Sequence, residues 1–328
     1  MSASPLSAVN GRIATGAGAA AALIRARAVA WDCPLTDTPG RMTLHVWGCE
    51  LRLIPDAPGA RVEISGGERQ MVLTLQDSAT QLLGDEGIEV AWDSVAAGAL
   101  APGLSLMRVT RITQRSPGFT RVRLSGQDAD RFWTGSLHFR LLLPPSGRQP
   151  VWPRISETGR TVWPDGDAAL HRPVYTTVDH GPGWIDFDVF RHDLSPTCDW
   201  TRTVPTGAEV AIIGPGGGRC PDAAEIVLFG DETAVPAISR MLHLGCSISR
   251  AHVRAAVHDL GDLANNPLVR PTDDLLAAVG DVARPGGPYI WFAGPDDEAR
   301  AVRTLLTQRG LKKTEFTSAA YWSRSKAA

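Results

Sequence analysis

Residues 225–242, EIVLFGDETAVPAISRML, decide the fold of this chain. Four apolar residues typical of a buried strand, 226–229, run directly into Gly230-Asp231-Glu232-Thr233. Apolar residues then recur at helical spacing as far as Leu242. A buried strand, a tight glycine turn and the beginning of a helix are the parts of a nucleotide-binding βα unit. The usual GxGxxG spacing is absent, so the pattern alone suggests such a site without defining it.

The C-terminal third of the chain repeats this alternation of strand and helix. Strands that alternate with helices form parallel sheets, because each crossover helix returns the chain to the same edge of the sheet. We therefore expect residues 222–328 to form an α/β domain. Its expected strands are 225–229, 252–257, 273–279, 289–293 and 314–317, and its expected helices are 234–244 and 296–309.

The pattern before this domain is typical of antiparallel strands. Short apolar or alternating runs, separated by Gly and Pro turns, occur at 106–114, 119–125, 137–143, 171–178, 185–191 and 209–213. They predict a closed six-stranded antiparallel β-barrel over residues 104–218, with a short helix at 195–203 and a long loop at 146–170. Gly214-Pro-Gly-Gly-Gly218 has the composition of a phosphate loop, but no helix pattern follows it, so we interpret it as a domain hinge.

Residues 1–98 predict a small α+β domain, to which the sequence assigns no chemistry. Residues 1–15 are rich in Ser, Ala and Gly and are expected to be loose, and residues 16–30 suit a short helix. Residues 96–103 are typical of a linker to the barrel. Strands are expected at 42–47, 50–54, 61–64, 71–75 and 88–92, with a further helix at 76–84.

Composition excludes several classes of protein. The chain has 328 residues and a formal net charge of −2, without a long run of Lys or Arg, which argues against nucleic-acid binding. Its five cysteines are dispersed without a CxxC pair, which disfavours a zinc or iron–sulfur site and fits reduced thiols in a cytoplasm. No apolar stretch is long enough to span a bilayer. We therefore expect a cytoplasmic protein.

The expected barrel strand at 171–178 carries residues suited to a flavin. A flavin nucleotide needs a cation for its pyrophosphate, an aromatic ring against the isoalloxazine and a small hydrogen-bond donor at N5. Arg172, Tyr175 and Thr176 can supply these groups, and a guanidinium matches phosphate geometry well. By chemistry alone, an ordinary barrel strand explains the same residues equally well.

The stretch DFDVFRHDLSPTCDW, residues 186–200, holds a second group of candidate residues. It places Phe190 and His192 at the end of a strand, and Thr197 and Trp200 on the short helix that follows. The N–H groups at the beginning of such a helix attract phosphate, and the hydroxyl of Thr197 adds a donor. A single histidine on a strand is otherwise usually structural.

These motifs resemble those of the siderophore-interacting proteins, a family of flavin-dependent ferric-siderophore reductases. GDETAVPAI, residues 230–238, is similar to a family signature, and Tyr175-Thr176 matches the end of its Arg-x-Tyr-Thr motif. The resemblance covers residues 104–326. It implies the ferredoxin-reductase plan, in which the barrel binds FAD and residues 222–328 bind NAD(P)H.

Further motifs carry the same resemblance, and several positions depart from it. His192 and Trp200 match a strand-end His and a helical Trp of the family, and Tyr321-Trp322 matches its C-terminal Tyr-Trp pair. Re-shaped phosphate contacts are expected from departures near the flavin motifs. Residues that differ from the usual family residues include Pro173, Asp193, Ser195 and Pro295.

At the GDETAVPAI junction the resemblance implies that the nicotinamide meets the flavin. Glu232, Thr233 and Pro236 are expected to contact the nucleotide, and Asp231 to cap the helix. Asp259 follows the next expected strand without a nearby Lys or Arg, which favours NADH weakly, since a nearby Arg favours the 2′-phosphate of NADPH. A ferredoxin is an alternative electron donor.

The implied substrate is a ferric siderophore, and its reduction needs no general base or nucleophile because the flavin carries the redox chemistry. His138-Phe-Arg140 is similar to a family strand that has Lys at its third position. Arg140 therefore edges the flavin, faces an anionic substrate or is an ordinary solvated charge. Arg324 and Lys326 are further candidates for attracting a negatively charged ferric chelate.

The sequence thus predicts a reductase that moves electrons from NAD(P)H through FAD to Fe(III)-siderophore and releases Fe(II). Two alternatives remain open. One is a general flavin reductase or electron-transfer oxidoreductase with a protein acceptor. The other is a flavin- or siderophore-binding module without turnover, which the departures at Pro173, Asp193 and Ser195 keep open.

Overall fold

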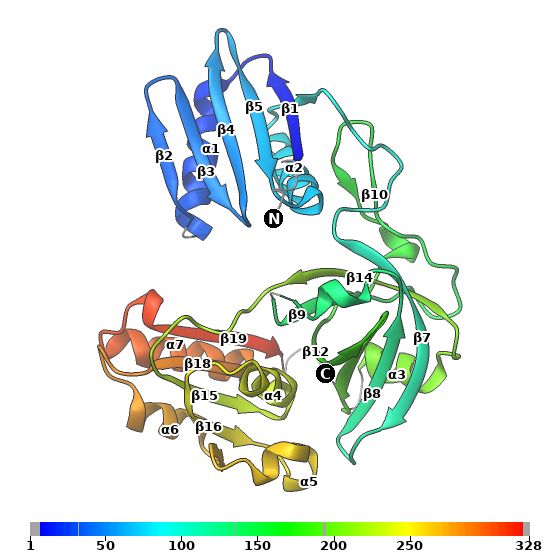
Figure 1. The fold of residues 1–328 in the computed structure, drawn as a ribbon, viewed down its shortest axis with the longest axis vertical. Helices are drawn as coiled ribbons and strands as arrows, with labels where there is room; N and C mark the ends of the chain where they lie inside the picture. Colours follow the sequence, from blue (N-terminus) through cyan, green and yellow to red (C-terminus); the bar gives the residue numbers. More distant parts are fainter. Residues whose placement is uncertain (1–6, 32, 135, 193–194, 324–328) are drawn as a thin grey trace. The chain divides into compact units, whose positions relative to one another are not determined.

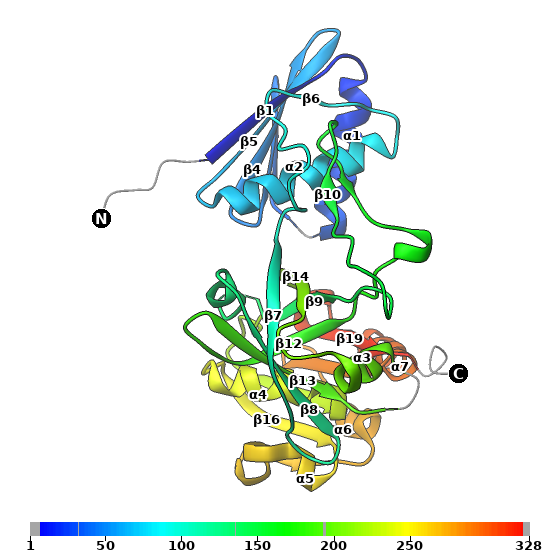
Figure 2. The ribbon, with the colours of Figure 1, turned by 90° about the vertical axis from the view of Figure 1, so that its right-hand side faces the viewer.

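The computed structural model describes residues 7–31, 33–134, 136–192 and 195–323, which divide into two compact units. The first unit runs to Leu104 and includes residues 147–170, and the second unit contains the rest. Figures 1 and 2 show a sheet with helices α1 and α2 in the first unit, and a barrel followed by a parallel sheet in the second. No helix among the described residues is long and apolar enough to cross a membrane.

The first unit contains a six-stranded sheet covered on one face by two helices. Its strand order is β2-β3-β4-β5-β1-β6, and neighbouring strands are antiparallel. Alternate strand residues and one side of each helix form a single apolar core, because strand side chains point to opposite faces in turn. The elements are β1 (Ser7–Ile13), α1 (Ala17–Trp31), β2 (Leu35–Thr38), β3 (Arg41–Val46), β4 (Cys49–Asp56), β5 (Gly59–Gly66), α2 (Arg69–Gly84) and β6 (Ala91–Trp92).

Two sequence predictions for this unit are wrong. The expectation of a loose N-terminus fails from Ser7 onward, because β1 pairs with β5 along its whole length, from Ser7 opposite Gly66 to Ile13 opposite Ala60. The expected strand at 71–75 is the beginning of α2. A five-residue apolar run does not distinguish a strand from a buried helix turn. The helix is set by apolar residues that continue at helical spacing and are buried, namely Val72, Leu75, Ala79 and Leu83.

The turn between β3 and β4 holds a tryptophan in an unfavourable backbone conformation. Trp47 and Gly48 form this two-residue turn, with φ angles of 54° and 72°. Two positive φ angles are typical of a type I′ hairpin turn, in which Asn, Asp or Gly is usual. The left-handed region costs other residues about 1–2 kcal/mol. The ring of Trp47 lies against that of Trp31, with the ring centroids 5.1 Å apart.

In the second unit, six antiparallel strands close into a barrel, which confirms the predicted fold class. The strand order around the barrel is β12-β13-β8-β7-β14-β9. Inward-facing apolar side chains of all six strands fill the barrel. The elements are β7 (Leu104–Gln114), β8 (Phe119–Ser125), η1 (Ala129–Phe132), β9 (His138–Leu142), β10 (Arg154–Ile155), β11 (Thr161–Val162), η2 (Gly166–Ala168), β12 (Val174–Gly181), β13 (Trp184–Phe190), α3 (Pro196–Thr203) and β14 (Glu209–Gly216).

The long segment between β9 and β12, residues 147–170, belongs to the first unit. The backbone N–H of Ile155 donates to the carbonyl of Ala99 at 2.9 Å. The N–H of Thr161 donates to the Asp77 carboxylate on α2 at 2.7 Å. The region expected to form the barrel domain therefore contains a segment whose hydrogen bonds lie with the N-terminal domain.

The α/β domain follows the barrel and contains a parallel sheet of order β17-β16-β15-β18-β19. Helices α4 and α5 contribute to the apolar core on one face, and α6 and α7 to the core on the other. The central β15 lies between β16 and β18, where the strand order reverses. The elements are β15 (Ile226–Asp231), η3 (Glu232–Ala234), α4 (Val235–His243), β16 (Ile248–Arg254), α5 (Val257–Leu260), η4 (Gly261–Asn265), β17 (Val269–Pro271), α6 (Leu275–Val282), β18 (Tyr289–Pro295), α7 (Asp296–Gln308), η5 (Lys313–Glu315) and β19 (Phe316–Trp322).

Two predictions in this domain differ from the structure. The expected strand at 273–279 is α6, which Asp274 caps by accepting a hydrogen bond from the N–H of Ala277 at 2.9 Å. The second strand, expected at 252–257, is β16, which begins at Ile248 and ends at Arg254. The polar residues Ser249 and Arg250 conceal its beginning from a search for apolar runs.

A buried arginine on α4 fastens the parallel sheet to the barrel. The guanidinium of Arg240 donates to the carbonyl of Leu137 at 2.5 Å and to that of Trp133 at 2.6 Å. It also lies over the Trp133 ring, 4.7 Å from the centroid. Both carbonyls belong to the barrel, in the segment that leads into β9. The side chain is almost fully buried, so these bonds compensate for the lost hydration of its charge.

A second fastening joins the β7–β8 turn to α5. The buried carboxylate of Asp259 accepts hydrogen bonds from Ser116 Oγ at 2.6 Å and from the N–H of Gly118 at 2.9 Å. Arg115 donates to the carbonyl of Asp259 at 3.0 Å. A Cβ atom at Gly118 would lie 2.2 Å from the same carboxylate, so this contact requires glycine.

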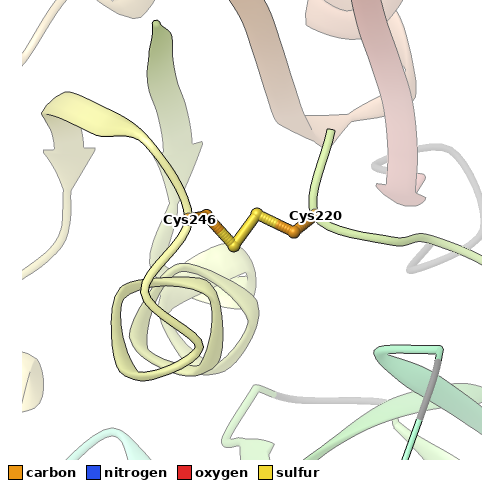
Figure 3. The surroundings of a disulfide bond; sticks show 2 residues. All are labelled: Cys220 and Cys246. Atoms are coloured by element: carbon orange, nitrogen blue, oxygen red, sulfur yellow. A yellow bond between two sulfur atoms is a disulfide. The ribbon is translucent and has the colours of Figure 1, made fainter. Parts of the chain in front are cut away.

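Two of the five cysteines form a disulfide, which corrects the expectation that all are reduced thiols. Figure 3 shows Cys220, before β15, bonded to Cys246, after α4. Their Cα atoms are 6.3 Å apart. Cys33, Cys49 and Cys198 are free thiols. No CxxC spacing indicates the pair, because 26 positions separate the two residues.

Replacing Arg240 is expected to weaken the second unit strongly. Arg240→Met keeps most of the apolar stem but leaves two buried carbonyls without their donors, which costs about 3 kcal/mol of unfolding free energy. Urea denaturation followed by tryptophan fluorescence measures the loss. Arg303→Met is the matched control, because the exposed Arg303 donates to one carbonyl, that of Ser318, at 2.8 Å. Equal losses in the two variants would contradict the assigned role of Arg240.

Candidate functional site

Two neighbouring barrel strands present a polar face opposite their apolar one. In the antiparallel pairing of β12 with β9, Thr176 lies opposite His138, and Val174 opposite Arg140. Side chains alternate along a strand, so these four residues share one face. Tyr175 between them points the other way and packs in the barrel core. The four residues on the shared face form the barrel side of the candidate site.

His138 joins this face to the last strand of the parallel sheet. Its Nδ1 is 2.9 Å from Thr176 Oγ1, and its Nε2 is 3.0 Å from the hydroxyl of Tyr321 on β19. The rings of His138 and Tyr321 meet edge to face, with centroids 5.6 Å apart. Burial, with a smaller effect of the Arg240 charge, lowers the pKa of His138 to about 4. At neutral pH the ring therefore carries one proton and bonds one neighbour as donor and the other as acceptor.

Asp231 holds the end of the same strand. Its Oδ1 accepts hydrogen bonds from the N–H and the hydroxyl of Thr233, at 2.9 and 2.6 Å. Its Oδ2 accepts one from the indole N–H of Trp322 at 2.7 Å. Asp231 is 0% exposed, and burial raises its pKa although the three donors act in the opposite direction. Burial and the charge of Asp231 in turn raise the pKa of Tyr321.

The sequence candidates at the GDETAVPAI junction therefore lie at the carboxyl ends of β15 and β18. Asp231 is the cap of η3, Glu232 and Thr233 are half-buried, and Pro236 is buried at the beginning of α4. This is the reversal point of the sheet, where open α/β sheets bind ligands. Burial is also the main cause of the raised pKa of Glu232.

The charged side chains around this edge of the sheet are mostly acidic. The first turn of α7 contains Asp296, Asp297 and Glu298. Arg254, the last residue of β16, donates to both carboxylate oxygens of Glu298, at 3.0 and 2.9 Å. Its charge is therefore already compensated by an acidic partner.

Asp259, on which the sequence argument for NADH rests, lies elsewhere. It is buried against the β7–β8 turn, where Ser116 and Gly118 occupy its carboxylate. The second strand also ends earlier than expected, at Arg254. The relevant residue at its carboxyl end is thus an arginine paired with Glu298 rather than a free carboxylate.

The barrel candidates divide between its surface and its core. Arg140, Arg172 and His192 are exposed, and Arg140 donates to the carbonyl of Arg172 at 3.1 Å. Phe190 is half-buried and meets Phe119 edge to face at 5.3 Å. The substrate candidates Arg324 and Lys326, and the departure at Asp193, lie outside the described residues.

Tyr175, Thr197 and Trp200 pack between α3 and the barrel. The ring of Tyr175 is 5.0 Å from that of Phe187, and its hydroxyl bonds to Thr197. Thr197 is almost fully buried, and its hydroxyl also lies 3.2 Å from His171 Nε2. The Thr197 hydroxyl thus already has hydrogen-bond partners within the protein. Ser195, which departs from the family motif, caps α3 by accepting a hydrogen bond from the N–H of Cys198 at 3.3 Å.

The shared face of β9 and β12 fits a flavin nucleotide. Val174 is 53% exposed there, and its apolar side chain suits contact with a flat aromatic ring system. Arg140 and Arg172 are exposed beside it and suit a pyrophosphate. The Thr176 hydroxyl, fixed by His138, offers a polar contact at the buried end of the same face. No group of three or more His, Cys, Asp or Glu in the described part of the chain is arranged to hold a metal ion.

A closed antiparallel barrel joined to a parallel sheet, with a polar face between them, defines the ferredoxin-reductase-like class of flavoproteins. Residues 108–219 match the siderophore-interacting FAD-binding domain, and residues 223–325 match the siderophore-interacting protein family. The chain belongs to the siderophore-interacting protein family through these two consecutive domains.

Similar proteins support this assignment. Ferric vibriobactin reductase ViuB of Vibrio cholerae is 27% identical over 242 residues, which are 64% of this chain and 86% of the relative. Ferric acinetobactin reductase of Acinetobacter baumannii is 28% identical over 170 residues, 45% of this chain and 59% of that protein. A siderophore utilization protein from T. fusca has a solved structure that is 25% identical and superposes with a TM-score of 0.53, covering 70% of this chain and 96% of its own.

Sequence reasoning did not find the hydrogen bonds that link the two domains. His138 and Tyr321 both occur in motifs that the resemblance singled out, but 183 positions separate them. No spacing rule predicts such a contact. The one available signal was that His138 and Arg140 stand two apart on an expected strand and therefore share a face.

Protonation of His138 is expected to destabilise the fold at acid pH. In the unfolded chain its pKa is near the ordinary 6.5, whereas in the fold it is about 4. Between these values the unfolded state binds a proton that the folded state does not. The contribution of His138 to the free energy of unfolding is therefore fully present above pH 6.5. It falls by up to ~1.4 kcal/mol per pH unit toward pH 4.

Urea denaturation at several pH values between about 4.5 and 7.5 measures this slope. His138→Gln retains a polar side chain and should lose the histidine's contribution to the slope. His243→Gln is the control, because His243 is exposed in the last turn of α4, where its Nδ1 bonds the carbonyl of Ser239 at 2.7 Å, and it should change the slope less than His138→Gln does. A slope in His138→Gln equal to that of the parent protein would refute the assignment.

Proposed function

We propose that this protein is an FAD-dependent reductase that moves electrons from NAD(P)H through the flavin to Fe(III) in a siderophore, releasing Fe(II). One observation carries the proposal: 86% of the length of a ferric vibriobactin reductase has a counterpart in this chain. The two family matches cover the barrel and the α/β domain, which are the parts that such electron transfer needs. The expected cytoplasmic location stays a prediction.

Bound FAD supplies the conversion between a two-electron donor and a one-electron acceptor, so the side chains bind and orient. In this proposal Val174 lies against the flavin ring and Thr176 contacts its polar edge. Arg172 and Arg140 face the pyrophosphate, which agrees with their exposure on one side of β12 and β9. Tyr175 supports this strand from the barrel core through Phe187 and Thr197.

The remaining cofactor candidates lie on β13, just after it and on α3. Phe190 is the last residue of β13, His192 follows two residues later, and Trp200 on α3 packs against the barrel core. Arg172 stands one residue before the position of the family's Arg. We assign it the same role because it is exposed beside Arg140. Arg140, with Arg324 and Lys326, would also attract a negatively charged ferric chelate.

NADH is the proposed donor, for a reason different from the one that the sequence suggested. Glu232, Thr233 and Pro236 at the sheet reversal would contact the nicotinamide nucleotide, with Asp231 as the fixed support. Arg254 is the cation best placed for a 2′-phosphate, and Glu298 already neutralises it. The neighbouring carboxylates of α7 oppose a further phosphate, which favours NADH over NADPH.

Flavin loading and two half-reactions test the function. The purified protein should take up FAD and show a visible flavin band. Without oxygen, NADH should bleach this band, and a ferric siderophore should restore it while a ferrous-specific chelator captures Fe(II). A colourless protein that takes up no FAD would refute both reductase functions. A bleached flavin that a ferric siderophore leaves bleached, but a protein acceptor reoxidises, would favour the general flavin reductase. Bleaching by reduced ferredoxin alone would overturn the choice of donor.

Glu298→Gln is expected to shift donor preference toward NADPH. It frees the guanidinium of Arg254 and removes one negative charge, so the KM for NADPH should fall about tenfold while that for NADH changes little. Asp296→Asn is the matched control, because it removes a carboxylate from the same helix turn, paired with Arg300 instead. Anaerobic flavin bleaching at varied nucleotide concentration measures both values. An equal response in the two variants would mean that net charge, and not Arg254, sets the preference.

A further inference from the structure

The first unit contains a groove that the reductase chemistry does not use. It lies over the sheet between α1 and α2 and has a volume of about 210 Å³. Its floor is apolar and comes from Leu44, Leu51 and Val62 on three neighbouring strands. By comparison, an apolar cavity of roughly 150 Å³ is enough to bind benzene. The groove therefore has room for one six-membered ring with a small substituent.

One tryptophan lines this groove, and a second tryptophan packs against the first. Trp31, the last residue of α1, lines it and is 37% exposed. Trp47 lies against Trp31 and is 42% exposed, although its backbone occupies the left-handed region. A strained residue that keeps a large ring in solvent gains little for folding, and such strain is concentrated at functional positions. The pair thus provides a stacking surface beside the apolar floor.

The groove carries one cation without a carboxylate partner. The guanidinium of Arg27 lines the groove and lies over Trp31, 5.0 Å from the ring centroid. Among the described residues no carboxylate pairs with it. The acidic residue of the groove, Asp85, is neutralised by Arg160 at 2.7 Å. Uncharged Ser78 and Gln81 line the opposite wall, on α2. The net charge that the groove offers a ligand is therefore positive.

From these observations we infer that the N-terminal domain binds a small aromatic anion of the benzoate class. The ring lies on the apolar floor beside Trp31 and Trp47, and the carboxylate pairs with the guanidinium of Arg27. Ser78 and Gln81 can add hydrogen bonds to the anionic group. This site lies wholly within the first unit and is independent of flavin and nucleotide binding.

Three features select this ligand over other classes. A neutral ring would leave the Arg27 charge unmatched, and a cation would be repelled by it. An aliphatic acid would fill the floor without stacking on the indole rings. A nucleotide or a whole ferric chelate is too large for a groove of about 210 Å³. The occupant is thus a single ring with a negative charge.

Calorimetric titration of the full-length protein tests the inference with four probes: benzoate, benzyl alcohol, benzylamine and cyclohexanecarboxylate. Benzoate is expected to bind about tenfold more tightly than benzyl alcohol, since one charge-assisted contact is worth about a factor of ten. Cyclohexanecarboxylate should bind more weakly than benzoate, and benzylamine should not bind. Equal binding of benzoate and benzyl alcohol, or no binding of benzoate, would overturn the proposal.

Three variants locate the site. Arg27→Gln should weaken benzoate about tenfold and leave benzyl alcohol unchanged. Trp47→Gly should weaken both ligands while keeping the melting temperature of the parent, because glycine accepts a positive φ. Arg25→Gln is the control on the same helix, where Arg25 pairs with Asp37 at 2.7 Å, and should leave binding unchanged. Unaltered benzoate binding in Arg27→Gln would place the anion elsewhere and refute the assignment. These titrations keep their meaning even if the protein proves unable to reduce ferric chelates.

Discussion

The buried carboxylate of Asp231 is the constraint on which the candidate flavin site depends. A carboxylate removed from water is very costly unless hydrogen-bond donors replace the water. Thr233 and Trp322 supply three such donors, and they belong to segments far apart in the sequence. The beginning of α4 and the end of β19 are thereby held at one point. Because Tyr321 precedes Trp322, its hydroxyl comes within reach of His138, which in turn fixes Thr176.

The two sets of hydrogen bonds that join the barrel to the α/β domain are of the same kind. Arg240 and Asp259 are both charged, both buried, and both bond to backbone atoms of the barrel. Backbone carbonyls and N–H groups persist whatever side chain the barrel carries at those positions. The contacts that depend on side chains of the barrel are those of Ser116 and Arg115 with Asp259, and Gly118 must stay glycine because a side chain there would collide with the same carboxylate.

The sequence predicted the fold class because both domains of the second unit have strong local signals. Turn residues separate the barrel strands, and long helical periodicity marks α4 and α7. The errors fall where local signals are ambiguous. Residues 71–75 and 273–279 are short apolar runs that suit a strand or a helix equally, and tertiary burial decides for the helix. β1 was missed because Gly and Ala weaken its pattern, although pairing with β5 holds it.

The sequence was sufficient to predict the motifs of the candidate site, but not the contacts between its residues. Tyr175, Thr176 and the GDETAVPAI junction were found from the residues themselves. The bonds from His138 to Tyr321 and from Arg254 to Glu298 connect distant parts of the chain, and only the folded topology brings them together. The strained Trp47 was equally invisible, because a Trp-Gly pair is not a usual hairpin turn signal.

The segment at 147–170 has a consequence for how this protein is divided. It leaves the barrel after β9, pairs with backbone and side chains of the N-terminal domain, and returns to the barrel at β12. The N-terminal domain is thus connected to the rest through three crossings of the chain rather than one. Deleting residues before 104 would strip Trp152 and Ile155 of the surroundings that bury them. Separating this domain from the barrel without exposing its core therefore requires changes at two places in the chain, near residue 104 and across residues 147–170.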